Sequence, residues 1–170
     1  ISKVFAYHSV IHYRDAYGLY ACNGILFNHE SPRRGVNFVT KKIVQGLVRI
    51  KQGKQKVLTL GNLYSRRDWG HANDYVESMW KILQQKKAND FVVATKTSNS
   101  VKDFINICAK KLNIKLIWKN KGLKEIAINK LTNKIIIKVD QKYFRETEVD
   151  NLIGDFSKAK KMLKWKPKYS

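Results

Sequence analysis

Cysteine, proline and glycine are scarce in this sequence, and it contains no long apolar run. The two cysteines, Cys22 and Cys108, lie far apart in apolar segments, which argues against a disulfide framework and a cysteine-based zinc site. We therefore expect a reducing, intracellular compartment and a cytoplasmic location. No apolar stretch approaches the ~20 residues that span a bilayer, so we expect no membrane segment. Because the chain begins with Ile1 and not with Met, we interpret it as an excerpt.

Several catalytic signatures are also missing. Neither GxGxxG, GxxxxGK nor GxSxG occurs, so the sequence carries no glycine-rich phosphate loop and no nucleophile elbow. His8 and His12 are four residues apart, a spacing that suits a metal ion on one face of a helix. No third ligand is evident, however, and the glutamate of an HExxH motif is absent. We therefore expect no metal site.

Basic residues dominate the charge of the chain. Its 34 Lys and Arg against 13 Asp and Glu give a formal net charge of +21. This excess is compatible with a nucleic-acid-binding module, in which basic side chains neutralise phosphates. Most of these residues are lysines scattered as on a solvated surface, whereas arginine can bind phosphate or carboxylate in two places at once. We therefore expect no nucleic-acid partner and look for chemistry at the arginines. They are Arg14, Arg33, Arg34, Arg49, Arg66, Arg67 and Arg145.

Apolar periodicity predicts alternating helices and strands. Helices are predicted at residues 2–17, 38–51, 71–85 and 100–112, with a short last helix ending at Leu163. Strands are predicted at residues 20–27, 57–60, 91–95 and 114–118, and a β-hairpin at 125–129 and 134–139. The predicted apolar stripe of the third helix is Val76, Met79, Trp80 and Leu83. The alternation favours an α/β fold with parallel pairing, in which ligands bind beyond the carboxyl ends of the strands.

The polar run NHESPRRG, residues 28–35, follows a strand of the type that is buried on both faces, and we predict a loop over residues 28–37. Its two arginines and one histidine suit a phosphate or a diphosphate. The same run is also compatible with a surface loop in which Glu30 pairs with an arginine. Its position after a strand favours a binding crevice.

Two further runs place arginine beside other charged groups. Arg66 and Arg67 lie in a predicted loop, residues 61–70, just before a helix whose backbone N–H groups favour an anion. Alternatively, Asp68 caps that helix and the arginines are solvated. In residues 143–150, Arg145 suits a phosphate and Glu148 a sugar hydroxyl, or the run is an ion-paired loop.

Read together, these segments resemble the GDP-mannose 4,6-dehydratase family of the extended short-chain dehydrogenase/reductase superfamily. The resemblance is carried by residues 13–43, 60–80, 90–95 and 140–167, and its most specific runs are NHESPRRG and RDWGHANDYVE. It implies the last part of a Rossmann-type sheet and a lyase that converts GDP-mannose to GDP-4-dehydro-6-deoxy-mannose, the GDP-fucose precursor. The reaction implied is an NADP-dependent internal redox dehydration.

The resemblance also implies that the chain is the C-terminal portion of this hydro-lyase. It places the glycine-rich turn and the catalytic Tyr, Thr and Glu upstream of Ile1, so we expect the chain alone to be inactive. Lys3 matches the lysine of the superfamily's YxxxK pair, which is catalytic because it holds the nicotinamide ribose and lowers the pKa of the tyrosine.

The resemblance assigns further residues to ligands. His29 and Arg34 join Lys3 on NADP. The residues assigned to GDP-mannose are Asn28, Val39, Lys42, Arg67, Arg145 and Glu148. We expect the guanidinium groups of Arg34, Arg67 and Arg145 to converge on one nucleotide sugar beside the dinucleotide. One departure is Glu146, where the family usually has proline, which adds negative charge beside Arg145.

We assign residues 1–37 and about 71–96 to the Rossmann sheet. Residues 38–70 and 97–170 are assigned mainly to a small, mixed α/β substrate-binding part. The expected partners are GDP-mannose and further copies of the chain, as a dimer or tetramer. Another nucleotide-sugar epimerase or reductase is the nearest alternative function, and a basic nucleic-acid-binding module is the alternative of a different class.

Overall fold

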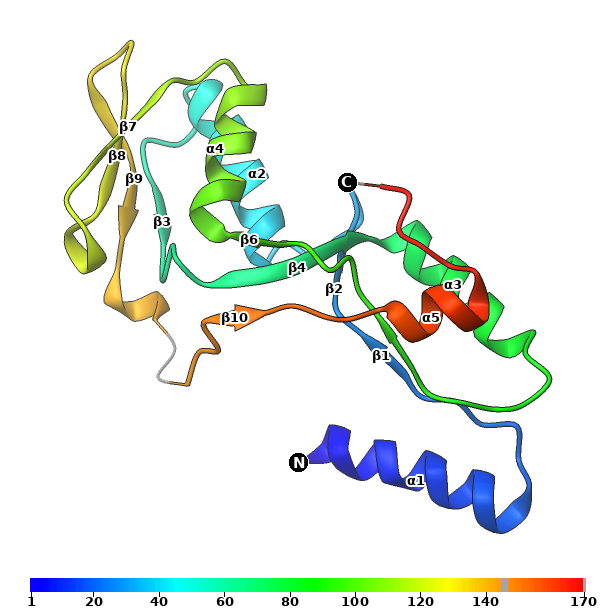
Figure 1. Cartoon of the computed structure of the whole chain (residues 1–170). Helices are drawn as coiled ribbons and strands as arrows, with labels where there is room; N and C mark the ends of the chain where they lie inside the picture. Colours follow the sequence, from blue (N-terminus) through cyan, green and yellow to red (C-terminus); the bar gives the residue numbers. More distant parts are fainter. Residues whose placement is uncertain (145–146, 170) are drawn as a thin grey trace. The chain divides into compact units, whose positions relative to one another are not determined.

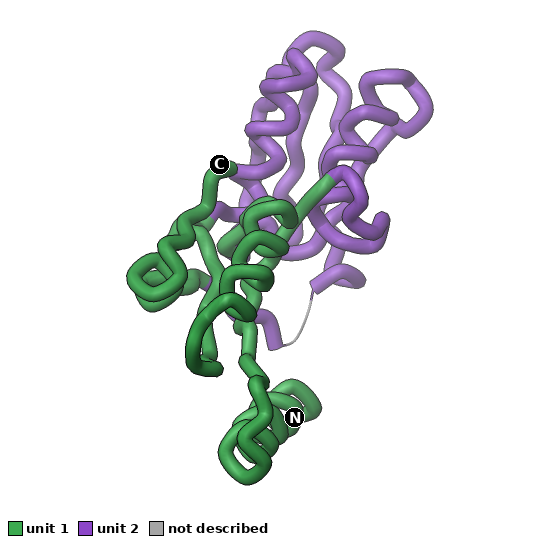
Figure 2. The backbone as a smooth tube through the Cα atoms, turned by 90° about the vertical axis from the view of Figure 1, so that its right-hand side faces the viewer, with its two compact units in different colours: residues 1–31, 68–98, 153–170 green, residues 32–67, 99–152 purple. Residues whose placement is uncertain are grey.

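The computed structural model describes residues 1–144 and 147–169, and the chain forms two compact units (Figure 2). Unit 1 consists of Ile1–Ser31, Asp68–Ser98 and Ile153–Ser170, and unit 2 of Pro32–Arg67 and Asn99–Leu152. These limits differ from the predicted parts, most clearly because residues 153–170 belong to unit 1. The assignment of cofactor and substrate binding to separate parts of the chain stays a prediction.

Unit 1 contains short parallel strands and three helices (Figure 1). Strand β1 (Gly24–Leu26) pairs in parallel with β5 (Phe91–Val93), and β2 (Asn28–Glu30) pairs in parallel with the second half of β4 (Arg66–His71). The helices are α1 (Ser2–Tyr17), α3 (Ala72–Leu83) and α5 (Ser157–Leu163). The buried core consists of Tyr75, Ile82, Phe91, Val93, Ala159, Leu163 and Trp165.

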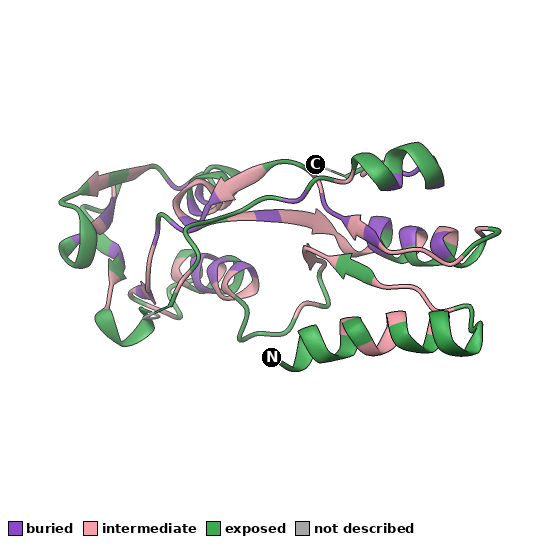
Figure 3. Cartoon of the chain, turned by 60° about the horizontal axis from the view of Figure 1, so that its bottom comes forward, coloured by how far each residue is buried: buried purple, intermediate pink, exposed green. Residues whose placement is uncertain are grey.

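Helix α1 has the bounds predicted for it, and it ends at Gly18, whose positive φ of 64° is the left-handed conformation of a helix C-cap. None of its residues is buried (Figure 3). Polar contacts hold it instead. The Arg14 guanidinium donates to both carboxylate oxygens of Asp90, at 2.8 and 3.1 Å, and to the carbonyl of Ala21. The amide of Asn23 donates to the carbonyl of Tyr7.

The predicted inward face of α3 is wrong. Val76, Met79, Trp80 and Leu83 are all exposed, Trp80 at 62%. The buried positions are Asp74, Tyr75, Ser78 and Ile82, and the polar side chains of Asp74 and Ser78 are hydrogen-bonded there. The backbone N–H groups of Lys168 and Tyr169 donate to the Asp74 carboxylate, and the Ser78 hydroxyl donates to the Tyr75 carbonyl. Bonding of this kind removes the cost of burying polar groups.

Unit 2 combines two helices with a mixed sheet of order β3-β9-β8-β7. The strands are β3 (Leu58–Leu60), β7 (Leu116–Lys119), β8 (Ile126–Asn129) and β9 (Lys134–Val139). Strands β8 and β9 form the predicted antiparallel hairpin, and β3 pairs with β9 in parallel. The helices are α2 (Val39–Lys51) and α4 (Val101–Lys111), and short 3-10 turns lie at Gly122–Lys124 (η1) and Gln141–Tyr143 (η2). The predicted α/β class is therefore confirmed.

Helix α4 begins at the predicted capping box. The Ser100 hydroxyl accepts from the backbone N–H of Asp103, and the Asp103 carboxylate accepts from that of Ser100. The backbone N–H groups of Val101 and Lys102 donate to the carbonyls of Ser65 and Leu63. The start of α4 thus holds the chain that leads into β4.

Four of the described strands, including the two-residue β10, were missed by the prediction, and one was overestimated. Strand β4 occupies residues predicted as a loop, and so does β2. The third is β6 (Ser98–Ser100), which also pairs with β4. The first half of β4 pairs in parallel with β10 (Asn151–Leu152), so its hydrogen bonds come from segments remote in sequence. The strand predicted at residues 20–27 is only β1, and its Gly24 and Ile25 are exposed and not buried. Among the described strands β1 pairs with β5 alone, which leaves it less covered than an inner strand.

Candidate functional site

Arg67 and Glu148, both predicted to bind GDP-mannose, lie in contact in unit 2. Nη2 of Arg67 is 3.1 Å from Oε1 of Glu148. Nη1 of Arg67 donates to the carbonyls of Arg66 and Val149, at 2.8 and 2.6 Å. The two side chains keep only 15% and 21% exposure. The structure thus brings together two predicted site residues that are 81 positions apart.

The pairing of β4 with β10 positions the backbone of both Arg67 and Glu148. Arg67 is paired with Leu152 in the β4–β10 register, and the backbone N–H of Arg66 donates to the carbonyl of Asp150. These bonds bring the segment that begins at Glu148 alongside β4. Arg145 precedes this segment but lies outside the described residues, so its convergence with Arg34 and Arg67 stays a prediction.

Lys42, also predicted to bind GDP-mannose, lies on α2 in unit 2. Its ammonium sits 3.9 Å above the centre of the Tyr143 ring, a cation–π contact, and burial lowers its pKa. Gly61 makes the position of Tyr143 possible, because a Cβ there would lie only 2.2 Å from the Tyr143 carbonyl oxygen. Tyr143 was not among the predicted site residues; its place in the same 143–150 run as Arg145 and Glu148 was the available signal.

A pocket of about 480 Å³ opens beside Lys42. It is bounded mainly by α2 and by the turn that carries Tyr143. Its lining combines two cationic side chains with amides and one aromatic ring: Val36, Asn37, Lys42, Gln45, Gly46, Arg49, Gln55, Leu58 and Tyr143. Such a lining suits an anionic ligand with a polar, planar group. Arg49 was named among the arginines but not assigned to a ligand.

Arg34 and Val39 lie at the start of the same helix. The Arg34 guanidinium stacks 3.5 Å above the centre of the Phe38 ring, and Phe38 is the N-cap of α2. Val39 is the first helical residue and is half-buried. The stacking fixes the plane of the guanidinium, which is how arginine is commonly oriented toward a planar anion.

His29 is held in unit 1 by its backbone and its ring. It lies on β2 next to Asn28, opposite Gly70 of β4. Its Nδ1 lies 2.9 Å from the carbonyl of Phe27, and because a carbonyl only accepts, Nδ1 carries the proton. Nε2 of the neutral ring is therefore left as an acceptor. The ring stacks on Tyr75 at a centroid distance of 4.8 Å.

Tyr75 is a buried residue with a polar hydroxyl that was not among the predicted site residues. Burial and the nearby carboxylates of Asp68 and Asp74 raise its pKa. Within residues 1–144 and 147–169, its buried hydroxyl has no hydrogen-bond partner. Gly70 lies against the ring, since a Cβ there would come within 2.4 Å of it. The ring therefore supports His29 through packing alone.

Arg66 and Arg67 lie in a strand and not in the predicted loop before the helix, and Asp68 does not cap that helix. Strand β4 continues to His71, and His71 caps α3, with its Nδ1 accepting from the backbone N–H of Asn73. Asp68 is fully buried in unit 1. Its carboxylate accepts from the backbone N–H and hydroxyl of Thr95 and from the backbone N–H groups of Lys96 and Gly154. Asp68 thus joins three segments of unit 1.

Lys3 lies exposed in the first turn of α1, in unit 1 with Asn28 and His29. The remaining described candidates belong to unit 2: Arg34, Val39, Lys42, Arg67 and Glu148.

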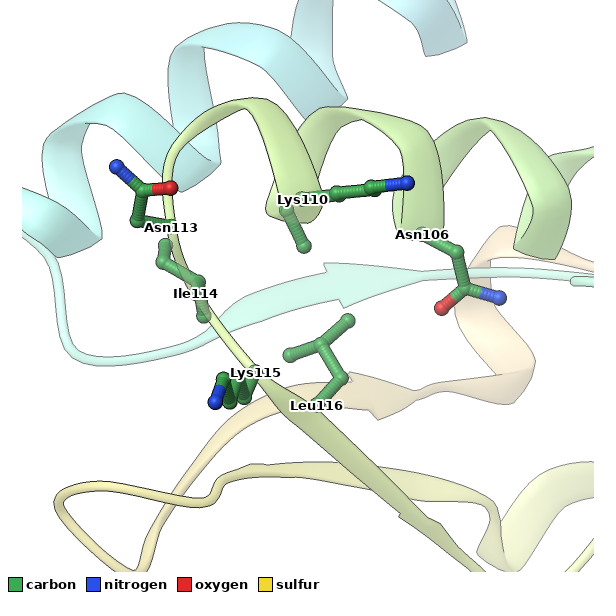
Figure 4. A pocket seen from close by; sticks show the side chains of 7 residues that line it. Asn106, Lys110, Asn113, Ile114, Lys115 and Leu116 are labelled. Carbon is green, nitrogen blue, oxygen red and sulfur yellow. The ribbon is translucent and has the colours of Figure 1, made fainter.

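A further pocket, of about 420 Å³, lies between α4 and β7 and contains no predicted site residue (Figure 4). Its labelled side chains come from α4, from the segment that follows it and from the first residue of β7: Asn106, Lys110, Asn113, Ile114, Lys115 and Leu116. No cluster of three or more metal-binding side chains occurs among residues 1–144 and 147–169. Within those residues, no helix has the length and apolar character needed to cross a membrane.

Comparison with known proteins settles the family. The family model described as GDP-mannose 4,6 dehydratase matches residues 1–170. The chain belongs to the GDP-mannose 4,6-dehydratase family. The resemblance carried by NHESPRRG and RDWGHANDYVE is thereby confirmed, and the dehydratase interpretation is favoured over the nucleic-acid-binding one.

Curated members of the GDP-mannose 4,6-dehydratase family match nearly the whole chain. The GDP-mannose 4,6 dehydratase of Dictyostelium discoideum is 50% identical over 170 residues, which are 100% of this chain and 48% of the relative. GDP-mannose 4,6 dehydratase 1 of Arabidopsis thaliana is 53% identical over 98% of this chain and 42% of its own length. The GDP-mannose 4,6 dehydratase of Homo sapiens is 48% identical over 98% of this chain and 45% of its own length. The chain thus spans about half the length of these dehydratases.

Solved structures support the fold of this GDP-mannose 4,6-dehydratase family member. RMD from Pseudomonas aeruginosa, complexed with NADPH, gives a TM-score of 0.77 at 18% identity and covers 99% of this chain and 50% of its own. The dTDP-glucose 4,6-dehydratase of Bacillus anthracis, in complex with NAD, gives 0.73 at 17% identity, with 97% and 45% covered. At these identities the likeness concerns the fold alone.

Proposed function

We propose that this chain supplies the substrate-binding residues, and part of the cofactor-binding residues, of a GDP-mannose 4,6-dehydratase. This enzyme is a hydro-lyase that converts GDP-mannose to GDP-4-dehydro-6-deoxy-mannose. The observation that carries the proposal is the identity of about 50% to curated dehydratases across the whole chain. The contact between Arg67 and Glu148 supports it, because two residues proposed for one ligand lie together.

GDP-mannose presents a diphosphate, a ribose, a guanine and a mannose. The chain offers cationic side chains for the diphosphate and a carboxylate for the ribose hydroxyls. Arg67 and Arg145 would bind the diphosphate through charge-assisted hydrogen bonds. Glu148 would accept from ribose hydroxyls. Lys42, with its lowered pKa, would donate to the nucleotide, and Asn28 and Val39 would complete the contacts. The pocket beside Lys42 offers two cations and several amides for an anionic, planar nucleotide.

The chemistry of the available groups also fits NADP. His29 keeps Nδ1 on the Phe27 carbonyl and so offers only Nε2, which can accept from a hydroxyl or, when protonated, donate to a phosphate. Arg34 offers a guanidinium oriented by Phe38, and Lys3 an exposed ammonium. When bound, NADP supplies the acceptor and donor of hydride for an internal redox reaction. The residues of this chain would bind and orient the cofactor. The ammonium of Lys3 would also lower the pKa of a nearby phenol.

The test is a chimeric enzyme in which this chain replaces the matching half of the Dictyostelium relative. Incubation with GDP-mannose and NADP should give a product that has lost one water, identified by mass spectrometry. Arg67→Ala should raise KM for GDP-mannose about 10- to 100-fold, since a charge-assisted contact contributes about 1.5–3 kcal/mol. Lys3→Ala should lower kcat far more than substrate affinity.

The controls separate this function from its alternatives. The chain alone should give no turnover, and turnover by it would contradict the proposed division of the enzyme. An epimerised or reduced product would assign another nucleotide-sugar reaction. Binding of DNA or RNA that persists in excess GDP-mannose and weakens steeply with salt would favour the nucleic-acid alternative. An unchanged KM in Arg67→Ala would refute the role of Arg67.

A further inference from the structure

The guanidinium of Arg67 is already occupied by three acceptors. Nη1 binds the carbonyls of Arg66 and Val149, and Nη2 binds the carboxylate of Glu148. The two carbonyls belong to backbone that the β4–β10 pairing holds in place. Glu148 is the one described side chain that bonds to this guanidinium, and therefore the acceptor that can move away most readily.

The charges of the pair largely cancel. Arg67 keeps 15% and Glu148 21% side-chain exposure, so their interaction is less screened by water than that of an exposed pair. An approaching phosphate therefore meets a neutral pair and not a free cation. An anion that takes the Nη2 donor now bonded to Glu148 must replace this carboxylate, and the displaced carboxylate then needs new hydrogen-bond donors.

Only some ligands can supply both groups. Inorganic diphosphate offers acceptors to Arg67 but has no pair of vicinal hydroxyl groups to donate to Glu148. A ribonucleoside diphosphate adds the vicinal hydroxyls of its ribose, which can donate to a carboxylate. The displaced Glu148 is then bonded again, and the cost of separating the pair is offset.

We infer that Glu148 is a specificity-determining residue that masks Arg67 against free phosphate and diphosphate and releases it to ribonucleoside diphosphates. This inference rests on the proposed function, in which Arg67 receives the diphosphate of GDP-mannose. It adds a competition to that function: the carboxylate that binds the ribose is the one that blocks the phosphate site beforehand. Glu148 therefore weakens the binding of one class of anion while it strengthens that of another.

The experiment measures binding to this chain by isothermal titration calorimetry with four probes: inorganic diphosphate, GDP, 2′,3′-dideoxy-GDP and UDP. It compares the unchanged chain with Glu148→Gln. The matched control is Asp150→Asn, which removes the same charge two positions away and keeps the backbone carbonyl that accepts from Arg66 of β4. Far-ultraviolet circular dichroism of each variant reports whether the fold is kept.

Glu148→Gln should bind inorganic diphosphate about fivefold more tightly, because it frees Arg67. It should also lose most of the preference for GDP over 2′,3′-dideoxy-GDP, while Asp150→Asn keeps that preference. A purely structural role of Glu148 predicts that all affinities fall together, and that result would overturn the inference. Equal changes in Asp150→Asn would also overturn it, since net charge alone would then suffice.

The comparison of UDP with GDP tests the proposed function separately from the role of Glu148. Equal affinity for UDP and GDP would count against a GDP-mannose enzyme but would leave the comparison of diphosphate with GDP decisive for Glu148. If Glu148→Gln does not fold, Arg67→Lys serves instead. A lysine keeps the positive charge but lacks the planar set of N–H donors of a guanidinium. The preference for GDP over inorganic diphosphate should therefore fall by more than fivefold. An unchanged preference would overturn the inference.

Discussion

The salt bridge between Arg14 and Asp90 permits a quantitative prediction for Asp90→Asn. Two hydrogen bonds from the Arg14 guanidinium, and one from the backbone N–H of Asn23, hold the pKa of Asp90 at about 2, against an ordinary value of 3.8. This difference corresponds to about 2 kcal/mol of stability at neutral pH. The figure is an upper one, because the Asp90 side chain keeps 16% exposure.

The loss should concentrate in α1, because this helix has no buried residue and depends on its polar contacts. An undocked helix of 16 residues is marginal in water and frays. Hydrogen–deuterium exchange of peptides from α1 should therefore be up to about 30-fold faster in Asp90→Asn at neutral pH. The control is Asp15→Asn, because Asp15 is 70% exposed and 3.7 Å from the same guanidinium, and it should change exchange little.

The pH dependence of stability tests independently whether the ionised Asp90 carboxylate stabilises the fold. A carboxyl whose folded pKa is lowered contributes stability that is complete above its unfolded pKa of 3.8 and is lost as pH falls toward about 2. The difference in unfolding free energy between the unchanged chain and Asp90→Asn should therefore close over this range. Urea titrations followed by tryptophan fluorescence would measure it. Unchanged exchange in α1, or a difference independent of pH, would refute the reasoning.

Three other substitutions test packing and capping by thermal and urea unfolding. Tyr75→Phe should leave the free energy of unfolding unchanged or raise it by about 1 kcal/mol, because it removes a buried hydroxyl that has no partner within the described residues; a clear loss would reveal a hidden contact. Gly61→Ala should lower it by about 1–3 kcal/mol, because the new methyl group would overlap the Tyr143 carbonyl, and normal stability would show that the turn moves freely. Ser100→Ala should cost about 1 kcal/mol through loss of the capping box, whereas Ser98→Ala, outside the box, is the control.

Local signals predicted the helices and the hairpin well. Gly18 and the Ser100–Asp103 pair marked helix ends because the caps depend on neighbours within a few residues. Strand β4 was missed because its partners, β2 and β10, are remote in sequence and its own residues are mostly polar. The buried face of α3 was missed for a related reason. Asp74 is buried only because the chain near Lys168 returns to bond it.

The candidate site was predictable in composition but not in geometry. The resemblance selected Arg67 and Glu148, and the structure places them in contact. Nothing in the sequence indicated that they bond to each other, since either could have faced solvent. The role of Asp68 was also hidden, because a carboxylate just before a helix ordinarily indicates a cap. Its four hydrogen bonds come from residues 95, 96 and 154.

The central residues of β4 have a consequence for how this sequence can vary. Arg67 bonds to Glu148 in unit 2, and its immediate neighbour Asp68 is buried in unit 1. Side chains along a strand point alternately to opposite faces, so gaining or losing one residue here would exchange the two directions. The guanidinium would then replace a buried carboxylate, and both units would fail at once. Length changes during evolution should therefore be tolerated in the exposed turn near Leu131 but not between Arg66 and His71.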